Sequence, residues 1–205
     1  MNTMPIDVKK NRIIFRELLQ CINRPGMDNL VDYLDNTDFF TAPCSTKYHL
    51  CVEGGLCQHS INVYKALLHI VPWFKSDLCK NRPSTDPIEY SIETIALVSL
   101  LHDICKVNTY KLNTRWRKNA DNEWEQYQTY EFDEDFPYGH GEKSVYIIQQ
   151  HIPLTPNEAQ AINMHMGFSD ERGVRLCGNI FNKNQLAVML HIADLIATYL
   201  MEGTQ

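Results

Sequence analysis

Two aspartates occur in segments of this sequence that are otherwise apolar. Asp103 follows His102 directly at the end of VSLLH, and Asp194 lies inside LAVMLHIADLIATYL. A buried carboxylate without a partner costs several kcal/mol, so each aspartate must be protonated, paired with a cation or bound to a metal. For Asp194 taken alone, a buried ion pair with Arg or Lys explains the residue as well as a metal does.

Histidines recur in the neighbouring segments. His59 lies on the apolar stripe of a predicted helix over residues 56–70, and His140 stands between two glycines at a helix start. His165 shares a helix face with Glu158. Each histidine alone is more simply explained as a structural residue. With His102 these are four histidines, and together with Asp103 and Asp194 they form a set of ligands that suits Mn, Fe, Co, Ni or Zn, and Mg less well.

The elements that must position these residues are mostly helices. Hydrophobic periodicity predicts helices over residues 7–22, 27–34, 56–70, 91–105, 140–151, 156–166 and 184–201. Residues 107–136 differ, because aromatic and threonine-rich stretches flank the polar KNADNE, and we expect a β-hairpin there. Loops are expected at 36–54 and 76–88, and Pro72 is expected to end the third helix.

Composition limits the function classes. With 19 Lys and Arg against 25 Asp and Glu, the formal charge is −6, which disfavours a large surface for duplex nucleic acid. Seven cysteines without a CxxC pair indicate reduced thiols in a cytoplasmic protein. The chain has no apolar run of ~18 residues, so we expect no membrane association. The absence of repeats and linkers predicts one domain over residues 1–205.

The ligand-bearing motifs resemble those of the HD-domain phosphohydrolase superfamily. Its signature is a distant His, an adjacent His-Asp and a later Asp. The corresponding residues are His59 in GGLCQHS, His102-Asp103 in LLHDICK and Asp194 in LHIADL. The similarity covers residues 45–200, whereas 1–44 form a helical N-terminal extension outside it.

Two further histidines resemble the branch of this superfamily that holds two metals. His140 in GHG and His165 in MHMG have a spacing similar to that in the HD domain of bacterial 3′→5′ exoribonucleases. The resemblance implies an all-α HD-domain bundle with an inserted hairpin, and a metal-binding core over residues 45–200. It also implies two divalent transition-metal ions, the first held by His59, His102, Asp103 and Asp194, the second by Asp103, His140 and His165.

The reaction implied is hydrolysis of phosphate esters of a nucleotide or similar small substrate by metal-activated hydroxide. Asp103 and Lys106 are the expected catalytic residues, and Lys106 is either a phosphate contact, a partner of Asp103 or a surface lysine. His49 is either a substrate contact or a solvated loop residue. Arg115 and Arg117, beside tryptophans, either grip a nucleotide or belong to a solvated hairpin with one packed face. His69, His151 and His191 are expected to be structural.

Two alternatives remain open from the sequence. One is a 3′→5′ exonuclease-type phosphodiesterase acting on short single-stranded nucleic acid, although no accompanying nucleic-acid-binding domain is present. The other is a catalytically inactive module that binds metal or nucleotide for regulation. The GYP motif of cyclic-dinucleotide phosphodiesterases is absent, which disfavours that substrate. The oligomeric state does not follow from the sequence.

Overall fold

Helices form most of the computed structural model, which describes residues 6–74, 90–169 and 174–202. The α-helices are α1 (Val8–Leu19), α2 (Met27–Asn36), α3 (Gly55–Phe74), α4 (Ile92–Leu101), α5 (His140–Gln149), α6 (Pro156–Asn163), α7 (Val174–Lys183) and α8 (Gln185–Ile196). Three short elements join them: the 3-10 helices η2 (Ile104–Lys106) and η3 (Gly167–Ser169), and the π-helix η4 (Ala197–Met201). The predicted loop at 76–88 lies outside the described residues.

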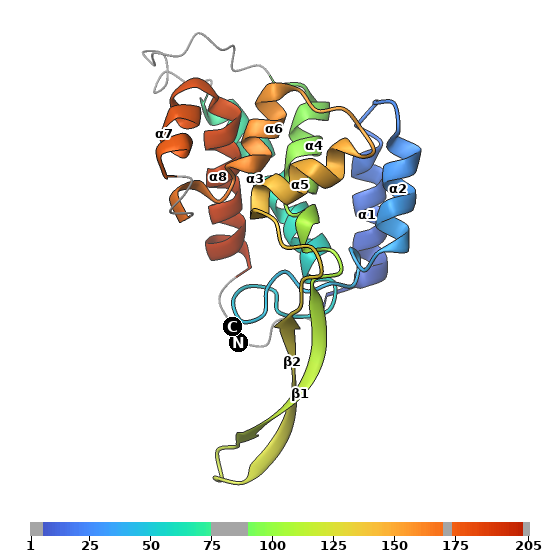
Figure 1. The fold of residues 1–205 in the computed structure, drawn as a ribbon, viewed down its shortest axis with the longest axis vertical. Helices are drawn as coiled ribbons and strands as arrows, with labels where there is room; N and C mark the ends of the chain where they lie inside the picture. Colours follow the sequence, from blue (N-terminus) through green and yellow to red (C-terminus); the bar gives the residue numbers. More distant parts are fainter. Residues whose placement is uncertain (1–5, 75–89, 170–173, 203–205) are drawn as a thin grey trace.

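The core forms where α3 packs against both α4 and α8 (Figure 1). α4 is apolar on nearly every side, and all residues from Ile95 to Leu101 are buried. A helix with no polar face can be stable only when other elements surround it. The apolar stripe predicted for α3 is also buried, and His59 lies on it. These central helices therefore carry the polar residues of interest into the interior.

The N-terminal helices pack against this core. α1 contacts α3 and α4, and Phe15 is buried with its ring centroid 4.8 Å from that of Phe39. Arg24, which follows α1, forms a buried ion pair with Glu158 on α6 at 2.6 Å. Glu158 also completes the capping box at the start of α6 with Thr155. The described part of the predicted N-terminal extension thus shares its packing with the rest of the chain.

The predicted hairpin is confirmed and projects away from the helices (Figure 1). Its antiparallel strands are β1 (Tyr110–Lys118) and β2 (Trp124–Phe132), with Tyr110 opposite Phe132 and Lys118 opposite Trp124. Side chains alternate between the two faces of a strand. One face therefore carries most of the exposed aromatic and apolar residues, and the other carries most of the charged ones.

Several helices differ from the predictions; the helix predicted over 156–166 ends at Asn163, and that predicted over 184–201 is α-helical to Ile196 and then π-helical. α4 ends at Leu101 instead of residue 105, because the chain tightens into η2 after His102. Pro72 does not end α3, which continues to Phe74, a residue that packs against the core. α7 was not predicted, because Gly178, Asn179 and Asn182 weaken its helical pattern. It forms because its buried face packs against α8.

The described residues include no single helix that is long and apolar enough to cross a membrane. α7 and the α8–η4 segment meet that test of length and composition only when they are taken together. The two are bent by 114° at the break between them.

Candidate metal centre

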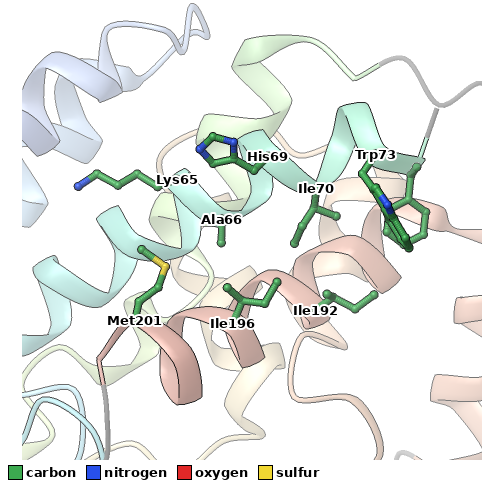
Figure 2. Close-up of a pocket in the computed structure, with 9 residues that line it drawn as sticks. Lys65, Ala66, His69, Ile70, Trp73, Ile192, Ile196 and Met201 are labelled. Carbon is green, nitrogen blue, oxygen red and sulfur yellow. The ribbon is translucent and has the colours of Figure 1, made fainter. Parts of the chain in front are cut away.

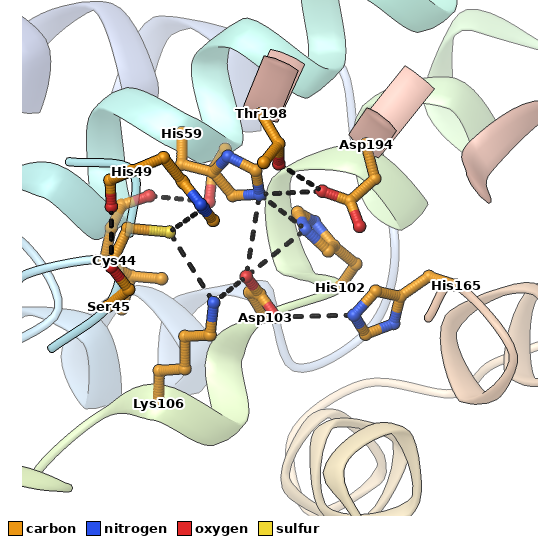
Figure 3. A network of polar contacts seen from close by, with 12 residues as sticks. Cys44, Ser45, His49, His59, His102, Asp103, Lys106, His165, Asp194 and Thr198 are labelled. Carbon is orange, nitrogen blue, oxygen red and sulfur yellow. Dashed lines mark hydrogen bonds and ion pairs between the residues drawn. The ribbon is translucent and has the colours of Figure 1, made fainter. Parts of the chain in front are cut away.

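The six residues predicted as metal ligands converge from five parts of the chain. His59 comes from α3 and Asp194 from α8, whereas His102 and Asp103 directly follow α4 (Figure 3). His140 is the first residue of α5, and His165 lies two residues after α6. Among the described residues, the close groups of potential ligand atoms are His59–His102–Asp194, His102–Asp103–His165, Asp103–Cys105–His140 and Cys44–His49–His59. These buried groups could hold a metal ion.

The two carboxylate oxygens of Asp103 face different histidines. Oδ2 lies 3.6 Å from Nε2 of His59 and 3.5 Å from Nε2 of His102. Oδ1 lies 2.8 Å from Nε2 of His140 and 3.4 Å from Nε2 of His165. Asp103 is buried, and its carboxylate stands between two sets of imidazole nitrogens, with Nζ of Lys106 2.7 Å from Oδ2. The carboxylate is therefore placed to take part in binding a metal ion.

Asp194 belongs to the set of ligands around His59. Its Oδ1 lies 3.1 Å from Nε2 of His59 and accepts a longer hydrogen bond from Thr198 at 3.4 Å. Its side chain is 15% exposed. Within the described ranges no Lys or Arg pairs with Asp194, so the simple ion pair that the sequence left open has no candidate cation there.

The orientation of the histidine rings fits metal binding. Nδ1 of His102 donates to the carbonyl oxygen of Ser99 at 2.8 Å, and Nδ1 of His165 donates to that of Ile162 at 2.6 Å. Because a carbonyl only accepts, Nδ1 carries a proton in both rings, and in the neutral ring Nε2 keeps a lone pair. Nε2 of His165 is buried and has no hydrogen-bond partner in the described part of the chain. A metal ion would satisfy this nitrogen.

Charge around the cluster favours ionised carboxylates and a neutral His102. Burial alone would raise the pKa of Asp103, but the charge of Lys106, with a hydrogen bond from His140, outweighs it and holds that pKa well below its ordinary value. Burial likewise opposes ionisation of Asp194, but His59 holds its pKa far below the ordinary value. Burial lowers the pKa of His102 to about 3. Burial opposes protonation of His59 and His165, but acidic neighbours outweigh it and raise the pKa of both rings, so a metal ion would displace a proton from each.

Two of the predicted substrate contacts, Lys106 and His49, lie beside the ligand cluster. Lys106 directs Nζ to Oδ2 of Asp103 at 2.7 Å and to Sγ of Cys44 at 3.6 Å (Figure 3). Lys106 is thus a partner of Asp103, which was one of the interpretations open from the sequence. His49 places Nε2 3.1 Å from Sγ of Cys44, and its ring centroid lies 4.9 Å from that of His59.

Arg115 and Arg117 are not brought to this cluster. They lie on the charged face of the hairpin, where Arg115 pairs with Glu131 and Arg117 pairs with Glu125 at 2.6 Å. Neither arginine is among the described residues that line the cavity beside the cluster. The sequence indicated basic residues beside aromatics, but it could not show that cross-strand glutamates pair with them.

The cluster forms the floor of a cavity of about 750 Å³. His49, His59, Asp103, Lys106, His140 and Asp194 contribute to its lining. Its walls are largely aromatic and include Tyr48, Tyr110, Phe132, Phe168 and Tyr199. The cavity therefore combines a charged floor with walls that suit a flat ring.

Four residues near the cluster were not predicted to belong to it. Glu202 accepts a hydrogen bond from Nδ1 of His59 at 2.9 Å, and Sγ of Cys105 lies 3.4 Å from Nδ1 of His140. Cys44 lines the cavity, and burial raises the pKa of its thiol to about 11. His191, expected to be structural, donates from Nδ1 to the carbonyl of His165 at 2.6 Å and also lines the cavity. No pattern in the sequence connects these residues with the cluster.

A second cavity, of about 710 Å³, lies between α3 and the α8–η4 segment (Figure 2). Its lining is mostly apolar and includes Ile70, Trp73, Ile192, Ile196 and Met201, with Lys65 and His69 at its edge. None of the groups of metal-ligating side chains found in the described residues lies there. Of these two cavities, the one lined by Asp103 is therefore the one that contains groups of metal-ligating side chains.

Comparison of the chain with protein-family models, with curated proteins and with solved structures found no match.

Proposed function

We propose that this chain is a metal-dependent phosphohydrolase of the HD-domain type. It hydrolyses phosphate esters of a nucleotide or a similar small substrate. The observation that carries the proposal is the position of Asp103, whose two oxygens face separate sets of imidazole nitrogens. The motifs around His59, His102-Asp103 and Asp194 support the family assignment.

The ligand set suits two divalent transition-metal ions. His59, His102 and Asp194 would hold the first ion and His140 and His165 the second, with Asp103 shared between them. Imidazole nitrogens combined with carboxylates favour Mn, Fe, Co, Ni or Zn over Mg. Bound in this way, such ions activate water as a nucleophile and stabilise charge on the phosphoryl oxygens.

Residues of the chain itself would bind and orient the phosphate. Lys106 contacts Asp103 and Cys44, and a lysine ammonium carries three donors, so one donor remains for a substrate oxygen. Its buried pairing with Asp103 overcomes desolvation and raises the pKa of Lys106 well above the ordinary value, so it stays cationic. A fixed cation next to the ligand cluster can neutralise a phosphate that enters the cavity.

Cavity size and walls favour a mononucleotide. A cavity of about 750 Å³ lies within the ~300–1,000 Å³ range that small-molecule sites occupy. Tyr110 and Phe132 form part of the wall beside Lys106. Aromatic walls can stack against a base while the phosphate contacts the floor.

A short single-stranded nucleic acid is a second candidate substrate, favoured by the hairpin. Tyr110 and Phe132 line the cavity, and the same hairpin face continues outward through the exposed residues Leu112, Trp116 and Trp124. Bases can stack on such a face with little sequence preference. The paired arginines of the opposite face add little net positive charge, which makes this candidate weaker than the mononucleotide.

A panel of nucleoside mono-, di- and triphosphates, a dinucleotide and a model phosphodiester tests the proposal. Protein treated with chelator is assayed with Mn, Co, Ni, Zn or Mg added back. We expect turnover of at least one nucleotide in Mn or Co, and loss of turnover in Asp103→Asn. Metal binding without turnover of any substrate would instead support the regulatory binding module.

A further inference from the structure

A chain of side-chain hydrogen bonds connects helix α1 to the candidate ligand His59. Nδ2 of Asn11 donates to Oε1 of Gln58 at 2.8 Å, and Nε2 of Gln58 donates to Oδ1 of Asn62 at 2.8 Å. Nδ2 of Asn62 then donates to Oε1 of Glu202 at 3.0 Å. The same carboxylate accepts from Nδ1 of His59 at 2.9 Å. Along this series of hydrogen bonds, each amide nitrogen donates toward Glu202, and the amide oxygens of Gln58 and Asn62 accept.

The helices place these residues together for simple geometric reasons. Gln58 and Asn62 are four residues apart on α3, so they share one helix face beside His59. Glu202 directly follows the π-helix η4, and Asp194 lies earlier on α8. π-helical turns are rare and occur often at functional sites. Each nitrogen of the His59 ring thus has a carboxylate partner, Asp194 of α8 at Nε2 and Glu202, directly after η4, at Nδ1.

Among the described residues, the carboxylate of Glu202 is bound by His59 and Asn62 and by no Lys or Arg. Its side chain is 1% exposed, and a buried carboxylate is costly unless donors or cations surround it. No Lys or Arg of the described ranges pairs with it; its ion-pair partners there are His59 and, at 3.8 Å, His49. Glu202 lies behind the imidazole ring, on the side opposite Asp194, and therefore acts on His59 from outside the ligand cluster.

We infer that Glu202 is a positioning residue for the metal centre and that the amides of Asn11, Gln58 and Asn62 hold it in place. By accepting from Nδ1–H, Glu202 fixes the tautomer and the angle of the His59 ring, so that Nε2 is available to a metal. Partners of this kind increase the basicity of a ligating histidine. The inference gives α1 a role in supporting the site. It rests on the proposed metal centre but does not depend on the proposed reaction.

Zinc titration by calorimetry of protein treated with chelator tests this inference. We expect Glu202→Ala to weaken zinc binding by ~10–100-fold, the usual effect of removing such a partner. Glu202→Gln should weaken it less, because an amide oxygen can still accept from Nδ1–H. Glu158→Gln is the matched control, since it also removes a buried carboxylate but leaves the His59 contacts intact. The control should lose stability and keep its zinc affinity.

Long-range ¹H–¹⁵N spectra of the zinc-loaded protein give a readout of the ring itself. In wild type and in Glu202→Gln, His59 should show a proton on Nδ1 and metal on Nε2. Asn62→Leu tests the support chain without touching the carboxylate and should weaken zinc binding by a smaller factor than Glu202→Ala. It also provides a second test should the alanine variant fail to fold.

Two outcomes separate the inference from the proposed function. If wild type binds zinc and both Glu202 variants bind it equally well with an unchanged His59 signal, the positioning role is refuted and the metal centre stands. If wild type itself binds no zinc or other divalent ion at the cluster, the metal centre is refuted and the positioning role with it.

Discussion

Replacing Asp194 with asparagine removes one negative charge from the cluster and leaves its shape nearly unchanged. Oδ1 of Asp194 lies 3.1 Å from Nε2 of His59, where a shared metal would bind both. An amide oxygen is a neutral and poorer ligand than a carboxylate. We expect Asp194→Asn to weaken metal binding about 100-fold, which corresponds to ~2.7 kcal/mol of binding free energy. The fold should persist, because Glu202 still contacts His59 from the other side.

This loss converts into a measurable shift of the unfolding temperature. Metal at 100 times the dissociation constant stabilises the native state by ~2.7 kcal/mol, whereas metal at a concentration equal to the dissociation constant stabilises it by only ~0.4 kcal/mol. For a chain of this size, 1 kcal/mol corresponds to roughly 2–4 °C in Tm. Chelator should therefore lower the Tm of wild type by about 5–11 °C and that of the variant by about 1–2 °C.

Thermal unfolding followed by circular dichroism, with and without chelator, measures both shifts. The metal concentration is set at 100 times the wild-type dissociation constant for both proteins. Equal chelator shifts in wild type and variant would remove Asp194 from the metal centre. A variant destabilised by roughly 3–5 kcal/mol in the presence and absence of chelator would indicate a buried ion pair instead.

Three further outcomes follow from particular contacts. His140→Ala should lose one of two bound metal ions, as measured by mass spectrometry of the metal content, and an unchanged content would exclude His140 as a ligand. Arg24→Ala should lower the free energy of unfolding by about 3–5 kcal/mol, because it leaves buried Glu158 unpaired. Burial opposes ionisation of Glu158, but Arg24 outweighs it and lowers the pKa of Glu158 from 4.5. In wild type the stabilisation from this pair is therefore present above about pH 4.5 and is lost as the pH falls below it. Urea unfolding measured against pH should show this loss in wild type and little of it in Arg24→Ala. Replacing Arg115 and Arg117 together with alanine should leave mononucleotide kcat/KM within about twofold, because both pair with hairpin glutamates, and a tenfold rise in KM would restore them as substrate contacts.

The sequence was sufficient to identify most of the elements and the residues that converge. His59 could be placed on a buried helix face because apolar residues follow it at helical spacing. Asp103 and Asp194 stood out because charge is costly in apolar segments. The hairpin followed from its aromatic and threonine content. These inferences depend on local patterns, which a single sequence carries.

Contacts between distant segments could not be derived in the same way. Glu202 reaches His59 only because η4 follows α8 and packs against α3. Cys44 meets Lys106 because a loop folds over the end of η2. The pairing of Arg115 with Glu131 depends on the register of the hairpin. Tertiary packing decides each of these, and nothing in residue type or spacing specifies it.

Crystals soaked in manganese and measured near its absorption edge test the central claim most directly. The account predicts two anomalous difference peaks about 3.5–4 Å apart. One should lie on the His59 side of Asp103 and the other on its His140 side, each in contact with an Asp103 oxygen. A map with no peak at this cluster, or with a single peak that does not touch Asp103, would contradict the proposed shared-carboxylate centre.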